Sequence, residues 1–219
     1  LPERKFKILG SSRTDAMVSA NDAAFELFLY EEPLGSPQDF LDLLNLNLPP
    51  DIRAISFEEV DENFNIINNP KIKEYLYLFS FGVKNHPFCA PFMAGFQQDL
   101  DIELMMQGAS LFQGTHNFKN YCVGASDKTQ FTRTLTTSEI RINDIYTANF
   151  FPQKSYAFHV HGSGFLRYQI RLMMGALVQL GMGEKTLNDI SGSLEPENEE
   201  VINFIAPASG LILQKIIFP

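Results

Sequence analysis

The stretch FLRYQIRLMMGALVQLG, residues 165–181, constrains the fold more than any other part of the chain. At helical periodicity it is apolar almost all round, as expected for a helix packed inside a protein. Such a helix needs other elements to cover it on several sides. The chain therefore has to fold into layers around residues 165–181.

Alternating and apolar runs elsewhere predict strands and further helices. The predicted strands are residues 6–9, 23–30, 52–60, 73–82, 138–149, 155–161 and 211–218. A short helix is expected from Pro37, with Ser36 as its N-cap, and others over residues 99–113 and 184–203. This order favours the α+β class with largely antiparallel sheet.

A Pro-containing break at residues 84–91 is the expected boundary between two parts of the chain. Residues 1–84 form the N-terminal half, and residues 85–219 form the C-terminal half, which carries the buried helix. The order of a helix followed by strands repeats after this break, which is the reason for placing the boundary there.

Composition limits the functional class. The net charge of −9 and the isoelectric point near 4.9 argue against a broadly basic nucleic-acid binder. The acids crowd two stretches, at residues 58–62 and 195–200, which leaves room for a local basic cleft. No apolar run is long enough for a membrane span or a secretion signal, so we expect a soluble, cytoplasmic protein.

Cys89 and Cys122 lack metal or redox spacing and are expected to be buried free thiols.

The segment GSSRTDAMVSAND, residues 10–22, is a loop with an unusual set of polar residues. In an extended segment Arg13 and Asp15 point to the same side. An arginine beside a carboxylate favours its ionised form, which can act as nucleophile or general base. The alternative interpretation is an ordinary salt bridge or Asx turn in a loop.

The apolar helix contains Arg167 and Arg171, four residues apart and therefore on one face. Arg171 lies deepest, where an unpaired charge is costly, so an acid or a phosphate has to meet it. Asp15 is a candidate partner. The alternative is that the arginines reach the surface along their aliphatic stems, which suits Arg167 better than Arg171.

Two alternating segments could carry further chemistry. The strand KEYLYLFSFG sets its aromatic residues on one face, and Tyr75 at its beginning could stack on a nucleobase, although such stripes usually form core. His159 and His161 share a strand face, but no third metal ligand is near them in the sequence. We interpret these histidines as structural and predict no metal.

Seven segments occur together in one order: SRTDAMVSA, LNLNLPPDI, KEYLY, FQGTHNF, TRT at residues 132–134, GSGFLRYQIRLMMG and APASGLIL. Taken together they resemble the tRNA pseudouridine synthase A family over almost the whole chain. The resemblance implies the pseudouridine synthase fold, with two ferredoxin-like, sheet-plus-helix halves joined around a central catalytic cleft.

The resemblance also implies roles for particular residues. Asp15 matches the catalytic aspartate of the family, and Arg13 matches the arginine that helps to displace the target nucleotide. Tyr75 matches the tyrosine that stacks on the uracil. Arg171 matches the arginine that pairs with the aspartate, and Leu211 matches the leucine that lines the uracil pocket.

The implied reaction is the isomerisation of uridine to pseudouridine in tRNA, with no cofactor or metal. Family members act on the anticodon stem and loop, at about tRNA positions 38 to 40, and work as homodimers. Because the base has to leave the stack, the site needs a stacking ring, an apolar wall and an ionised carboxylate near the sugar.

The chain departs from the family pattern in several places. Ser12 and Met17 replace glycines, so side chains occupy positions where we expect close approach to RNA or a positive φ. Ser19 replaces a histidine, an RNA-contacting arginine is missing from residues 64–67, and the family's opening strand and helix are not found before Leu1. Lys71 or Lys73 is expected to replace the missing arginine.

Two other functions stay open at this stage. One is a diverged RNA-binding or protein-interaction homologue with weak or no catalysis, which the acidic charge and the altered loop favour. The other is a carboxylate-based hydrolase of small substrates, which needs a second acid or base near Asp15. The joint presence of Arg13, Asp15, Tyr75, Arg171 and Leu211 favours the synthase.

Overall fold

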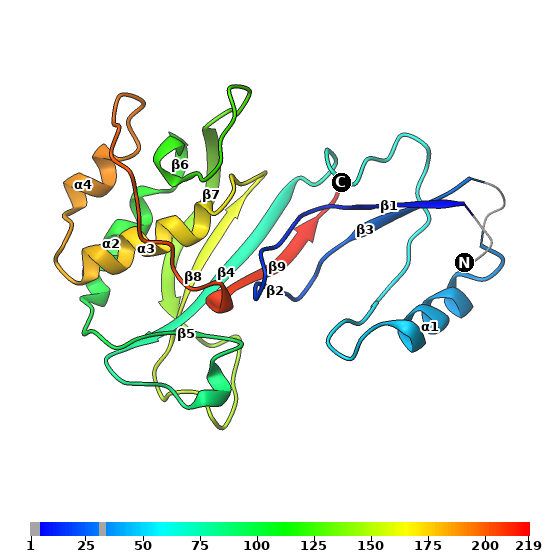
Figure 1. Cartoon of the computed structure of the whole chain (residues 1–219), viewed down its shortest axis with the longest axis horizontal. Helices are drawn as coiled ribbons and strands as arrows, with labels where there is room; N and C mark the ends of the chain where they lie inside the picture. The colour runs from blue at the N-terminus through cyan, green and yellow to red at the C-terminus, as the bar shows by residue number, and fades with distance from the viewer. Residues whose placement is uncertain (1–4, 31–33) are drawn as a thin grey trace. The chain divides into compact units, whose positions relative to one another are not determined.

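The computed structural model describes residues 5–30 and 34–219, which form two compact units (Figure 1). The smaller unit contains the described residues up to Ser12 and from Ala24 to Asn69. The larger unit contains Arg13–Ala23 and Pro70–Pro219, and therefore all five expected site residues. The expected division into residues 1–84 and 85–219 concerns the halves of the family fold and stays a prediction.

The smaller unit begins with two paired strands. β1 (Phe6–Gly10) and β3 (Phe25–Leu29) run antiparallel, as their sequences predicted. The helix α1 (Pro37–Asn47) begins where the sequence places it, because the Ser36 side chain accepts a hydrogen bond from the Asp39 N–H.

The predicted strand at residues 52–60 was wrong, since none of these residues lies in a strand. The Asn45 side chain takes the place of a neighbouring strand at Ala54. Its Oδ1 accepts from the Ala54 N–H at 2.8 Å, and its Nδ2 donates to the Ala54 carbonyl at 2.9 Å. The alternating sequence therefore lies outside any strand.

In the described part of the larger unit, seven strands form one sheet, and most of its pairings are antiparallel. Its order is β2 (Ser19–Ala20), β9 (Leu211–Ile217), β4 (Ile72–Phe81), β8 (Tyr156–Gly162), β7 (Thr132–Ile142) and β6 (Gly114–Asn117), with β5 (Ala94–Phe96) beside β4. The α+β class is confirmed.

β7 differs from its predicted range, residues 138–149. It starts earlier because residues 132–135 pair with β6, and it ends at Ile142. The Asn143 side chain then accepts hydrogen bonds from the N–H groups of Ile145 and Tyr146. This local turn ends the strand.

Helices α2 (Ile102–Leu111) and α3 (Gln169–Gly181) pack against one face of this sheet (Figure 1). α3 is buried on most sides, as its sequence predicted. The two helices approach closely at Gly108, where an added Cβ would lie 2.3 Å from Leu180 Cδ2. The expected buried helix is thus the centre of the main core.

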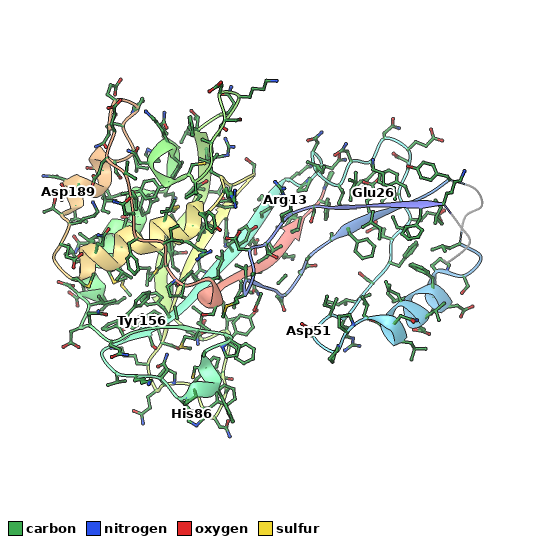
Figure 2. All side chains as sticks on the ribbon, viewed as in Figure 1. Arg13, Glu26, Asp51, His86, Tyr156 and Asp189 are labelled. Atoms are coloured by element: carbon green, nitrogen blue, oxygen red, sulfur yellow. The ribbon has the colours of Figure 1, made fainter. Side chains whose placement is uncertain are left out.

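Three predicted helices were too long. α2 covers only Ile102–Leu111 of the predicted residues 99–113, because Asp101 is its N-cap. α3 begins at Gln169 and not at residue 165, because Tyr168 has a left-handed backbone (φ 65°) that no α-helix continues. α4 covers only Leu187–Gly192 of the predicted residues 184–203, and it is capped by Thr186 and Asp189. Asp189 is labelled in Figure 2. Pro196 prevents the continuation of α4.

The opposite face of the sheet is covered by two loops, which meet where Cys89 Sγ lies 3.0 Å from the Phe150 carbonyl oxygen. Cys89 is buried, as expected, whereas Cys122 is half-buried, and both are free thiols. Within residues 5–30 and 34–219, no helix has the length and apolar character needed to cross a membrane.

Candidate active site

The loop that carries Asp15 is a tight turn anchored to the edge of the sheet. The Val18 N–H donates to the Asp15 carbonyl at 3.1 Å, and β2 then pairs in parallel with β9. Met17 in this turn has a φ of 68° and an exposed side chain. The expected positive φ is therefore confirmed at Met17, and Ser12 is not among the described residues with positive φ.

Asp15 pairs with Arg171, as predicted from the cost of leaving that arginine unpaired. Asp15 Oδ2 lies 3.0 Å from Arg171 Nη1, and the two side chains are 32% and 14% exposed. Among the described residues, Asp15 forms no ion pair with Arg13, which is exposed at the start of the same loop (Figure 2). The local Arg13–Asp15 pair expected from the sequence is thus replaced by a long-range one.

Two further groups, the Ala206 carbonyl and the Tyr168 ring, hold the Arg171 guanidinium in place. Its Nε donates to the Ala206 carbonyl at 2.8 Å, and the Ala206 N–H donates back to the Arg171 carbonyl. Its Cζ lies 5.0 Å from the centre of the Tyr168 ring. Arg171 stands in the first turn of α3, where a cation opposes the helix dipole, so the carboxylate of Asp15 also offsets this penalty.

Tyr75 and Leu211 lie on the sheet face that α3 covers. Tyr75 stands opposite Leu213, and Leu211 stands opposite Tyr77, so Tyr75 and Leu211 are diagonal neighbours on β4 and β9. Both are buried in the main core. The Tyr75 ring meets Phe165 edge-on, with centroids 5.1 Å apart. The structure thus brings an aromatic ring and an aliphatic wall to one face.

Tyr77 fixes the segment that leads into Leu211. Its hydroxyl donates to the Pro207 carbonyl at 2.7 Å. Burial raises the pKa of Tyr77, and the positive charge of Arg171 opposes that rise. At Gly210 an added Cβ would lie 2.7 Å from the Tyr77 ring.

Several of these supporting residues were missed by the sequence analysis, namely Tyr77, Tyr168, Ala206 and Gly210. The second tyrosine of KEYLY and the glycine of APASGL were visible as motif members, but their contacts are tertiary. Ala206 contributes its backbone carbonyl, and the residue type at position 206 does not predict such a contact.

Lys73 lies on the same strand face as Tyr75, two residues before it. It is half-buried, and burial lowers its pKa. This position suits a cation that reaches a bound nucleotide, so the expectation that a lysine replaces the missing arginine stays a prediction for Lys73.

The histidine pair lies on the other face of the sheet. His159 stands opposite Leu76, and both histidines are partly buried. Burial is the main cause that lowers the pKa of His159, with the positive charge of Arg141 adding to it. In the part of the chain that the structure describes, no three His, Cys, Asp or Glu side chains gather as metal ligands would.

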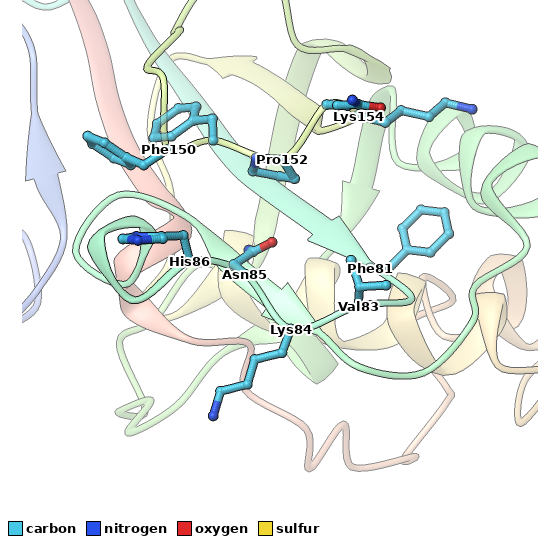
Figure 3. A pocket seen from close by; sticks show the side chains of 10 residues that line it. Phe81, Val83, Lys84, Asn85, His86, Phe150, Pro152 and Lys154 are labelled. Atoms are coloured by element: carbon cyan, nitrogen blue, oxygen red, sulfur yellow. The ribbon is translucent and has the colours of Figure 1, made fainter.

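A surface cavity of about 470 Å³ lies at the far end of β4 (Figure 3). Its lining includes Phe81, His86 and Phe150, and none of the five expected site residues. Along β4, Phe81 is six residues beyond Tyr75, about 20 Å at the rise of a strand. Figure 3 shows Lys84 pointing away from Phe150 and Pro152. The cavity is therefore separate from Asp15.

Comparison with known proteins finds relatives of this chain over almost its whole length. Residues 109–219 match a family described as tRNA pseudouridine synthase. The chain is 29% identical over 219 residues to the tRNA pseudouridine synthase A of Oenococcus oeni. This match covers all of this chain and 83% of that protein. It is 32% identical over 215 residues to the tRNA pseudouridine synthase A of Bacillus sp. strain KSM-64, covering 98% of this chain and 83% of the relative.

Proposed function

Since this chain belongs to the tRNA pseudouridine synthase family, a class of isomerases, we propose that Asp15 is its essential catalytic carboxylate. We propose further that it converts uridines of the anticodon stem and loop, at about tRNA positions 38 to 40. The observation that carries the proposal is the 3.0 Å pair between Asp15 and Arg171, beside the face that holds Tyr75 and Leu211.

The reaction breaks the bond between uracil N1 and ribose C1′ and joins C1′ to uracil C5, so no atom is gained or lost. The target nucleotide first has to leave the stack. Arg13 is exposed at the entrance to the loop, where it helps to displace that nucleotide. Tyr75 then stacks on the uracil, and Leu211 forms the apolar wall of its pocket.

Asp15 acts on the sugar or on the base. It can take a ribose proton, attack C1′ or add to the uracil ring, and all three routes need the ionised carboxylate. The guanidinium of Arg171 supplies a fixed positive charge for that form, and its own geometry is set by the Ala206 carbonyl and the Tyr168 ring.

The remaining assignments follow the family. We propose a homodimer that acts on tRNA in the cytoplasm and needs no cofactor. These assignments are independent of the role of Asp15, so sedimentation of the purified chain with and without tRNA tests the dimer separately.

The test of Asp15 uses unmodified tRNA transcripts incubated with the parent chain, Asp15→Ala and Asp15→Asn. Carbodiimide-dependent primer extension then maps pseudouridine. Asp51→Asn is the matched control, because Asp51 is an exposed acid outside the larger unit. We expect modification by the parent and by Asp51→Asn at the same uridines, and none by the two Asp15 variants.

If the parent binds transcripts but modifies none of them, the proposed reaction is wrong and the chain is a diverged RNA-binding homologue. If Asp15→Ala modifies tRNA at the parental rate, the role of Asp15 is wrong.

A further inference from the structure

Three arginines of the larger unit, Arg13, Arg133 and Arg167, form no ion pair with an acid among the described residues; Arg13 is exposed in the Asp15 loop, and the other two are held by neutral groups. The ion pairs found there join Arg141 to Glu139, Arg171 to Asp15, and Lys185 to Glu200. Arg133 and Arg167 are absent from these pairs. In a chain with a net charge of −9, uncompensated cations beside the candidate site need an explanation.

Arg167 is held in place by neutral groups. Its Cζ lies 5.3 Å from the centre of the Tyr168 ring, the same ring that Arg171 contacts. Its carbonyl accepts from the Val123 N–H at 3.2 Å. Gly124 has a φ of 69°, and a Cβ there would lie 3.4 Å from Arg167 Nη1. The guanidinium therefore lies against the turn at residues 122–124.

Arg133 is also fixed without an acid. It lies in β7, and its Nη1 donates to the carbonyls of Gln130 and Thr132 at 2.8 and 2.7 Å. Carbonyl oxygens orient a guanidinium but leave its positive charge uncompensated. An arginine held in this way is preorganised for an anion from outside the chain.

The charges of both arginines act on the same side chain, Cys122. Burial raises the pKa of its thiol, while a hydrogen bond with the Arg167 backbone and the positive charges of Arg133 and Arg167 oppose that rise. Both arginines also contact the loop of residues 118–131 between β6 and β7, Arg133 through the Gln130 carbonyl and Arg167 through the Val123 N–H.

We propose that Arg133 and Arg167 form a phosphate-binding site for the tRNA substrate, beside the candidate active site. The proposal rests on the proposed function, because it assigns the anion to a phosphodiester of that tRNA. Tyr168 lies against Arg167 and against Arg171, which pairs with Asp15, so the bound phosphate belongs to a nucleotide near the target uridine. Guanidinium groups bind phosphate oxygens through paired hydrogen bonds, which suits this role.

The test measures binding of an unmodified tRNA transcript to the full chain over a series of salt concentrations. The variants are Arg167→Gln, Arg133→Gln and, as the matched control, Arg141→Gln, which removes an equal charge from an exposed arginine of β7. Each lost phosphate contact should weaken binding roughly tenfold at low salt and flatten the plot of log Kd against log salt by about 0.7 to 0.9.

We expect weaker binding and a flatter salt plot in Arg167→Gln and in Arg133→Gln. KM should rise and kcat should stay within about twofold of the parent, because such a contact stabilises the ground state and the transition state equally. Arg141→Gln should keep the parental slope. Arg133→Gln also loses two hydrogen bonds, so the decision rests on Arg167→Gln, whose side chain is exposed.

A parental salt slope in Arg167→Gln, or a change no larger than in Arg141→Gln, overturns the phosphate site. Binding is measured without turnover, so this outcome is distinct from failure of the proposed isomerase, in which the parent chain itself modifies no transcript.

Discussion

Asp15 and Arg171 are 156 positions apart in the chain, yet Oδ2 of the acid lies 3.0 Å from Nη1 of the arginine. If this pair holds the carboxylate for catalysis, Arg171→Gln should lower kcat about 10- to 100-fold, the scale of one hydrogen bond between charged groups. Arg171→Lys should be intermediate, because it keeps the charge and loses the planar donor set. Single-turnover kinetics at saturating tRNA measures the effect. A parental kcat in Arg171→Gln would contradict it.

Tyr75 provides a second test of the site. Tyr75→Phe keeps the ring and its edge-on contact with Phe165, so we expect turnover close to that of the parent. Tyr75→Leu keeps apolar volume but loses the stacking surface, and it should lower kcat/KM about 10- to 100-fold, since stacking of a base on an aromatic ring contributes ~1–3 kcal/mol. Thermal unfolding of both variants provides the control for folding. Equal activity of the two variants would rule out stacking on Tyr75.

Two buried tyrosines make the fold sensitive to alkali. Burial raises the pKa of Tyr77 and of Tyr121 above the value of about 10 that tyrosine has in an unfolded chain. Their contribution to stability is therefore fully present below about pH 10. Above it the free energy of unfolding should fall by up to ~1.4 kcal/mol per pH unit for each tyrosine, because only the unfolded chain releases the protons.

Denaturant unfolding over a range of alkaline pH measures this slope. Tyr77→Phe and Tyr121→Phe should each make it shallower, although Tyr77→Phe also loses the hydrogen bond to Pro207 and about 1 kcal/mol at neutral pH. A slope unchanged in both variants would show that other groups cause the alkaline loss.

Periodicity and charge were enough to predict much of the fold and the central pair of the site. The strand at residues 73–82 and the buried helix were visible because their side chains face one continuous core. An acidic or phosphate partner for Arg171 could be predicted because an unpaired charge within an apolar run is costly. The resemblance to a family then supplied the remaining site residues, whose catalytic roles stay predictions.

The parts that sequence could not predict depend on backbone conformation and on tertiary contacts. Residues 52–60 alternate like a strand, but the Asn45 side chain bonds the Ala54 backbone instead. The first turn of the predicted helix is lost at Tyr168, where the chain takes a left-handed conformation that a tyrosine seldom adopts. The Ala206 carbonyl that orients Arg171 belongs to a segment without any periodic pattern.

Met17 stores strain next to Asp15, since a side chain in the left-handed region costs about 1–2 kcal/mol. Met17→Gly should remove this cost and lose little packing, because Met17 is 70% exposed. Glycine also gives the unfolded chain more conformational freedom, which lowers the free energy of unfolding by about 0.5–1 kcal/mol. We therefore expect a net gain of about 0.5 kcal/mol in the free energy of unfolding. Met17→Ala is the control, because it removes the same side chain and keeps the strain. A gain of the same size in Met17→Ala would show that the backbone is unstrained.

Gly210 tests whether the turn before Leu211 is fixed. A Cβ at residue 210 would lie 2.7 Å from Cε1 and Cζ of Tyr77 and 2.8 Å from the Leu78 carbonyl oxygen. Neither neighbour can give way easily, because the Tyr77 hydroxyl is bonded to Pro207 and Leu78 lies in the middle of β4. Gly210→Ala should therefore cost about 1–3 kcal/mol of stability and displace Leu211, so that kcat/KM falls as well.

The matched control is Gly164→Ala, since no atom lies within 4 Å of a Cβ added there. We expect this variant to unfold at the parental denaturant concentration and to keep its activity. If Gly210→Ala behaves in the same way, the turn at residues 208–210 can move to accept a methyl group, and Leu211 is not held rigidly enough to shape a pocket. If only Gly210→Ala loses both stability and activity, the contact of Tyr77 with this turn positions Leu211 for the substrate.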